Sequence, residues 1–217
     1  MKDEIAGTLS DIDGLIAFLE SSYKEDALEE RDDDYGLCVG MRDVWGDFSH
    51  ITPHQVDEIV FDFLNGWGRC RLSRDSYALS HKLSKLEKSV SVFRGIVLSN
   101  WRVTDGLMDK IHTLHSIEAI FDELVETKLK GRRLGPTAAS KILHMAVPAF
   151  FVMWDVNIRE HWGCFGNGAG YSSFMVRMSL LIDEVKAQGG KSVKKVLGEK
   201  SEAVPRLLDR YNYDRYE

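Results

Sequence analysis

Apolar residues recur at helical spacing along almost the whole chain, and this pattern limits the fold more than any other feature. Spacings of three and four residues place apolar side chains on one helix face, whereas a strand needs alternation, which is nearly absent here. One stripe ends at Gly189 and Gly190, where a helix C-cap is expected. It consists of Phe174, Met178, Leu181, Ile182 and Val185. The sequence therefore predicts an all-α fold.

The same spacing predicts further helices, separated by irregular stretches. Proline suits a first helical position, so Thr52 and Pro53 mark one helix start. Ser116 restarts the pattern after an earlier stripe and opens a helix of its own. The apolar stripes are Val56, Ile59, Val60, Phe63 and Leu64; Leu79, Leu83, Leu86 and Val90; Leu107, Ile111 and Leu114; Ile117, Ile120, Phe121, Leu124 and Val125; and, in a last short helix, Val204, Leu207 and Leu208. Functional residues are expected in the irregular stretches 31–50, 65–75, 127–136 and 163–171.

Length and charge set the possible partners. A chain of 217 residues can form one domain, 1–217, whose two helical lobes share a cleft. The net charge of -6 is concentrated in an acidic N-terminal segment, 1–34, which holds 12 acidic and three basic residues. The other 183 residues carry +3. Binding to nucleic acid therefore has to depend on a local basic patch.

Location and cofactors follow from what the chain lacks. No apolar run approaches the roughly 18 to 20 residues of a membrane span, and Met1 to Glu4 do not resemble the basic start of a secretory signal. Cys38, Cys70 and Cys164 are too few and too widely spaced for a disulfide framework or a metal cluster. We expect a cytoplasmic monomer with no metal, no cofactor and no membrane contact.

The stretch from Thr127 to Lys141 is basic and contains no acidic residue. Its cations are Lys128, Lys130, Arg132, Arg133 and Lys141. Gly131 and Gly135 bracket a tight turn, and Pro136 follows as a first helical residue. Backbone NH groups at such a turn can hold a phosphate oxygen, although a basic loop that only aids solubility has the same composition.

Asp155 follows the apolar residues 150–154 and opens the segment WDVNIREHW. An aspartate at a helix start accepts hydrogen bonds from free NH groups, which favours its ionised form. This carboxylate is either a plain N-cap or a catalytic group.

Together, these two elements resemble the helix-hairpin-helix superfamily of DNA glycosylases. Its members carry a hairpin of the form L-x-G-x-G-x-K-x-A shortly before a segment V-D-x-H-V-x-R. Here residues 134–139 match the end of the hairpin and residues 154–158 match the aspartate segment. The resemblance covers about residues 120–165 and implies a helix-hairpin-helix element at about 117–147 that binds double-stranded DNA through Lys130, Gly131, Arg132, Arg133, Gly135 and Thr137. It also implies that Asp155 is the catalytic carboxylate of an enzyme that flips out a base and cleaves its N-glycosidic bond.

The departures from the family pattern concern the mechanism. Thr137 stands where bifunctional members have their nucleophilic lysine, and Lys141 lies one helical turn further on, as a displaced nucleophile or a phosphate ligand. Asn157 occupies the family's histidine position, and the iron-sulfur cysteines are missing. These departures resemble either a lysine-independent glycosylase with a single activity or an atypical branch such as the archaeal 8-oxoguanine DNA glycosylases.

The base must be held by groups that replace its lost stacking. Trp67, in the turn 65–69, is the expected stacking platform, with Trp154 and Asn157 beside it. The other aromatic candidates, of which most are expected in the core, are Trp45, Phe48, Trp101 and Trp162. The substrate is either an oxidised purine or a hypermodified base of foreign, for example phage, DNA. The alternatives are a DNA-binding protein without catalysis and a protein-interaction module whose acidic segment meets a basic partner.

Overall fold

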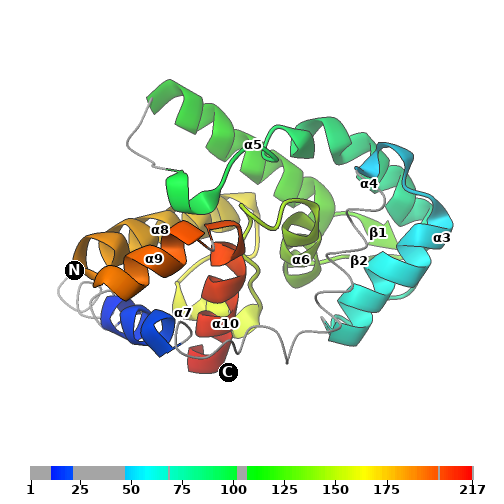
Figure 1. The fold of residues 1–217 in the computed structure, drawn as a ribbon. Coiled ribbons are helices and arrows are strands. Elements are labelled where there is room, and N and C mark those ends of the chain that lie inside the picture. Colours follow the sequence, from blue (N-terminus) through cyan, green and yellow to red (C-terminus); the bar gives the residue numbers. More distant parts are fainter. Residues whose placement is uncertain (1–10, 22–46, 68, 102–106, 200, 217) are drawn as a thin grey trace.

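The computed structural model is almost entirely helical, as the apolar spacing predicts (Figure 1). It describes residues 11–21, 47–67, 69–101, 107–199 and 201–216. The main helices are α4 (Ser76–Ser91), α5 (Leu107–Val125), α6 (Pro136–Ala146), α7 (Val156–His161), α8 (Gly168–Gln188), α9 (Lys191–Glu199) and α10 (Val204–Tyr216). Within the described ranges, strands occur only as the pair β1 (Lys128–Leu129) and β2 (Arg132–Arg133).

Shorter helical segments complete the chain. Residues 11–21 form a helix near the N-terminus, and a continuous helical stretch runs from Pro53 to Trp67. That stretch consists of α3 (Pro53–Gln55), the π-helical segments η2 (Val56–Val60) and η3 (Phe63–Trp67), and a helical link between them. Thr52 caps it, as expected, in a capping box with Gln55. The 3-10 turns are η1 (Phe48–His50), η4 (Leu98–Asn100) and η5 (Ser201–Ala203).

The long helix α5 lies at the centre of the packing, against α8 on one flank and α6 on another (Figure 1). In the view of Figure 1, α3, α4 and the β1–β2 hairpin lie to one side of α6, and α8, α9 and α10 lie to the other. Helix α10 contacts α7, so the end of the chain returns to the segment that follows α6. Two segments far apart in the sequence, residues 136–161 and residues 204–216, therefore meet here.

The core is rich in aromatic side chains. Trp154 contacts Phe121, Tyr171 and Phe174, with ring centroids 5.6, 5.0 and 5.3 Å away. Each of these rings is buried, and burying a side chain of this size contributes roughly 1.5–3 kcal/mol. The Tyr171 hydroxyl donates to the Val152 carbonyl at 2.8 Å, which satisfies its polar atom. This cluster fixes the chain immediately before Asp155.

Three sequence predictions differ from the observed elements. The predicted break at Ser116 is wrong, because α5 is continuous and the Ser116 hydroxyl donates to the His112 carbonyl of the preceding turn at 2.8 Å. Residues 168–171 are helical, since Asn167 caps α8 through the NH of Gly170. The last helix is 13 residues long. The apolar stripe from Phe174 to Val185 is buried as predicted, and Gly189 caps it with extended backbone.

No helix in the described parts of the chain combines the length and apolar character needed to cross a bilayer.

Candidate active site

A short β-hairpin connects α5 to α6 within the stretch predicted as irregular. Lys128 pairs with Arg133 and Leu129 with Arg132, and the two turn residues between them, Lys130 and Gly131, have φ of 48° and 83°. Two successive positive φ values are typical of a type I′ turn, which matches the twist of paired strands and explains a glycine at the second position. Leu129 is buried, whereas the cationic side chains are exposed. The basic residues therefore face solvent.

The start of α6 provides backbone donors. Gly135 has φ of 80° and is the N-cap, and Pro136 is the first helical residue, as predicted. No side chain caps this end of the helix. The NH of Gly135 donates to the Val125 carbonyl at 3.3 Å, which ties the turn to the end of α5. Because proline has no NH, the donors of the first turn belong to Thr137 and Ala138.

Asp155 is the N-cap of α7, as predicted. Its Oδ1 accepts a hydrogen bond from the NH of Ile158 at 2.9 Å, and its side chain is half-buried. The short helix begins here because the preceding residues are extended and buried, and an aspartate can cap the first free NH groups.

Hydrogen bonds hold the segment of Asp155 against α6. The NH of Trp154 donates to Ser140 Oγ at 3.2 Å, and the indole Nε1 donates to the Pro136 carbonyl at 3.3 Å. Ser140 is fully buried, so these bonds form away from competing water. Asp155 is thus fixed beside the first two turns of α6, although the two elements are separated by a loop in the sequence.

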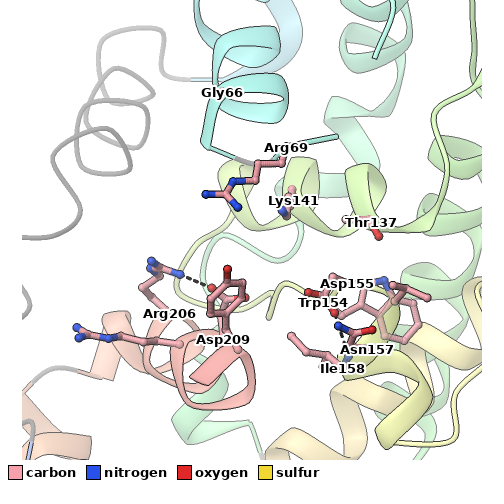
Figure 2. A pocket seen from close by; sticks show the side chains of 13 residues that line it. Gly66, Arg69, Thr137, Lys141, Trp154, Asp155, Asn157, Ile158, Arg206 and Asp209 are labelled. Atoms are coloured by element: carbon pink, nitrogen blue, oxygen red, sulfur yellow. Dashed lines mark hydrogen bonds and ion pairs between the residues drawn. The ribbon is translucent and has the colours of Figure 1, made fainter. Parts of the chain in front are cut away.

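A cavity of about 640 Å³ lies between α6, the Asp155 segment and α10. This volume is within the range of roughly 300–1,000 Å³ of small-molecule sites. Figure 2 shows Asp155 and Asn157 on one side, Arg206 and Asp209 on the other, and Lys141 and Arg69 above them. The lining residues are Gly66 and Arg69; Thr137 and Lys141; Trp154, Asp155, Val156, Asn157 and Ile158; and Arg206, Asp209, Arg210 and Tyr213.

The structure brings several predicted site residues together and leaves others apart. Thr137, Lys141, Trp154, Asp155 and Asn157 all line the cavity. Lys130, Gly131, Arg132 and Arg133 belong to the hairpin and are exposed. Arg133 forms an exposed ion pair with Glu126 at 3.0 Å, a contact worth little in water.

The aromatic candidates divide into core residues and residues outside the described part of the chain. Trp154 is 1 % exposed and Trp101 is 5 % exposed, and Phe48 and Trp162 are buried as well. Trp162 also donates through Nε1 to Asn212 Oδ1 at 3.2 Å. These rings pack in the core, as expected for most of the set. Trp67 ends η3, but its side chain, like Trp45 and Cys38 as a whole, lies outside the described residues.

Asp209 is one of the cavity residues that sequence reasoning missed. Its side chain pairs with Arg206, and the residue is only 7 % exposed. Burial raises the pKa of Asp209 to about 6, and nearby Asp155 acts in the same direction, while Arg206 and Lys141 favour the carboxylate. Burial therefore affects the pKa of Asp209 more strongly than the ion pair with Arg206 does. One sequence signal was available, because Arg206, Asp209, Arg210 and Tyr213 recur at i, i+3, i+4 and i+7 on one face of α10.

The cavity is cationic although the chain is acidic. Four basic residues line it, namely Arg69, Lys141, Arg206 and Arg210, against two carboxylates, Asp155 and Asp209. Arg69 has φ of 48°, an uncommon conformation for a residue with a side chain. An excess of cations around a cavity favours a ligand that carries negative charge.

Two cysteines lie in the described part of the chain. Cys70 and Cys164 are half-buried, and burial raises the pKa of each thiol. Among the described residues, no cluster of three or more histidine, cysteine or acidic side chains has the arrangement of a metal site.

No protein-family model matches this chain, and no curated protein and no solved structure matches it either. The functional argument therefore depends on the two motifs and on the geometry of the cavity.

Proposed function

We propose that this protein is a DNA glycosylase that extrudes a damaged or modified base from double-stranded DNA and cleaves its N-glycosidic bond. The observation that carries the proposal is that Asp155 and Lys141 line one cavity and that Asp155 is fixed to the helix that follows the basic hairpin. This chemistry uses a carboxylate to stabilise charge on the sugar and either water or an amine as the nucleophile, while a turn that binds phosphate positions the duplex.

DNA is gripped by a helix-hairpin-helix element formed by α5, the β1–β2 hairpin and α6. The uncapped first turn of α6 offers backbone NH groups to one phosphate oxygen, and the helix dipole favours a negative charge there. Lys130, Arg132 and Arg133 are exposed and reach neighbouring phosphates. These contacts carry no base information and serve to position the duplex. In this proposal the segments on either side of α6 act as two lobes around a cleft.

The extruded nucleotide enters the cavity, with its base between the Asp155 segment and α10. Unstacking a base costs a few kcal/mol, and the cost is lower for a weakened or modified pair. Arg69 and Arg210 line the cavity and offset the phosphate charge that accompanies the nucleotide. The apolar contact comes from Val156 and Ile158, which lie beside Asp155.

Bond cleavage develops positive charge on the sugar, which Asp155 stabilises across a short distance. The attacking group is either water or the amine of Lys141, and Asp155 accepts its proton. Thr137 cannot form an imine with the sugar. Lys141 lies one turn deeper in α6 and still lines the cavity, which supports it as the displaced amine.

A non-catalytic DNA-binding protein is the second candidate, and Thr137 at the usual lysine position favours it. Such a protein keeps the hairpin and binds duplex DNA without releasing any base.

Base release from defined duplexes tests the proposal. Duplexes that carry 8-oxoguanine, other oxidised or alkylated bases, or hypermodified phage-type bases are incubated with the protein, and abasic sites are then cleaved with alkali. We expect one class to be released and Asp155→Asn to abolish release, while DNA affinity stays within severalfold, because asparagine also caps a helix. Mass spectrometry of bases released from genomic DNAs extends the search beyond this panel. If no base is released, the glycosylase assignment is wrong. If Asp155→Asn releases bases at the wild-type rate, the catalytic role of Asp155 is wrong.

A further inference from the structure

The cavity contains two carboxylates in unlike surroundings, which come from different parts of the chain. Asp155 is half-buried at a helix start, and its Oδ1 accepts a hydrogen bond from the NH of Ile158. Asp209 lies on α10 across the cavity, and its residue is 7 % exposed (Figure 2). A pair of carboxyl groups with divergent environments is the usual arrangement for one ionised and one protonated partner in bond cleavage.

We infer that Asp209 is the general acid that protonates the departing base, opposite Asp155. This inference rests on the proposed glycosylase function. It assigns separate roles to the two carboxyl groups of the same site, with Asp209 as the proton donor and Asp155 as the proton acceptor. The buried position of Asp209 on the cavity wall provides the required contact with the base, and Arg206 holds its carboxyl group in place.

The charges that face Asp209 come from four elements. Arg206 lies on the same helix, Lys141 on α6, Asp155 before α7 and Tyr171 on α8. Burial and Asp155 favour the protonated acid, and the two cations oppose them, so that the pKa of Asp209 is raised to about 6. A general acid works best when its pKa lies near the pH of the reaction.

Base release in this proposal transfers two protons, one from Asp209 to the base and one from the nucleophile to Asp155. The bond between C1′ and the base nitrogen breaks, and its electron pair stays with the base, which takes the proton of Asp209. The nucleophile, water or the Lys141 amine, forms a bond to C1′ and gives its proton to Asp155. Both carboxyl groups regain their starting state by proton exchange with solvent. The substrates are therefore bases that are uncharged before cleavage, since a cationic alkylated base leaves without protonation.

Single-turnover base release as a function of pH tests this assignment. The probe is the duplex that carries the uncharged base released fastest by the wild type. We expect wild-type release to fall above about pH 6, following the Asp209 titration. Asp209→Asn should slow release about 100-fold at pH 5.5 and remove the fall at higher pH, since general acids contribute roughly 10²–10⁴-fold. Asp209→Glu should restore part of the rate of base release and also the decrease of this rate at higher pH.

Two further variants test whether Asp209 acts as a general acid or only supports the structure. Arg206→Gln removes a cation that lowers the pKa of Asp209, so the fall should move to higher pH. The pH at which base release falls in Arg206→Gln therefore tests the role of Asp209 even if Asp209→Asn folds poorly. Asp183→Asn makes the same chemical change on α8, at a residue that does not line the cavity, and should keep the wild-type profile. A duplex with 7-methylguanine, if released, should be cleaved equally by wild type and Asp209→Asn.

The outcomes are distinguishable. A wild type that releases a base with a flat pH profile, or an Asp209→Asn variant with an unchanged profile, overturns the general acid and leaves the glycosylase in place. An Asp209→Asn variant that slows release equally at every pH also overturns it. A wild type that releases no base overturns both proposals.

Discussion

The two walls of the cavity differ in how far the sequence predicts them. The wall made by α6 and the Asp155 segment is predictable because a glycine-proline helix start and an N-cap aspartate are local features, each formed within a few residues. The wall made by α10 is not, because its ion pair between Arg206 and Asp209 resembles an ordinary i,i+3 pair on a solvated helix. Burial alone changes its chemistry, and burial is set by residues far away in the sequence.

The strongest test of this contrast is Lys141→Gln, on the first wall. Loss of the amine should slow base release about 100-fold at pH 5.5, because the variant keeps the shape of the cavity and loses the nucleophile. The fall in rate should also move to higher pH, since Lys141 lowers the pKa of Asp209. Borohydride should trap an imine between wild-type protein and substrate DNA, and the variant should give none. Lys194→Gln, on the exposed face of α9, is the control. If Lys141→Gln releases the base at the wild-type rate, water and not the Lys141 amine is the nucleophile.

The second test concerns the stability that α10 contributes. The pKa of Asp209 rises from 3.8 to about 6 on folding, so its favourable contribution is complete below about pH 4 and is lost as the pH rises through 6. This loss amounts to up to about 3 kcal/mol of unfolding free energy, since one pKa unit is about 1.4 kcal/mol. Urea unfolding of wild type and Asp209→Asn from pH 4 to 7.5 measures it. Parallel curves for the two proteins would contradict the raised pKa.

A third test asks whether the hairpin beside the first wall grips phosphate. Arg132→Ala with Arg133→Ala should weaken binding to every duplex sequence by roughly tenfold or more at low salt and reduce the salt slope by about 2. Titrations by fluorescence anisotropy at several salt concentrations give both numbers. Lys191→Ala with Lys194→Ala removes equal charge from exposed positions on α9 and should leave the slope nearly unchanged. An unchanged salt slope in the double arginine variant would mean that the hairpin does not contact the DNA phosphates.

The smallest expected effect comes from the contacts that fix Asp155. Ser140→Ala leaves the buried NH of Trp154 without its acceptor and should lower stability by about 1–3 kcal/mol. Base release should fall severalfold, because Asp155 is held less firmly. Ser179→Ala on α8, which loses a buried hydrogen bond to the Trp101 carbonyl, should cost similar stability and keep the rate. Equal rates in both serine variants would mean that Asp155 does not depend on this contact.

The sequence by itself determined the helical fold through the spacing of apolar residues, the start of α6 through Gly135 and Pro136, and the cap through Asp155, because helix periodicity and capping depend on neighbours within about four residues. It missed the continuity of α5 through Ser116 and the type I′ hairpin, whose strands are too short to alternate. Only the tertiary structure decided that Lys141, Asp155 and Asp209 share one cavity and that Asp209 is buried. Desolvation depends on every element that packs around a group, and no local pattern encodes it.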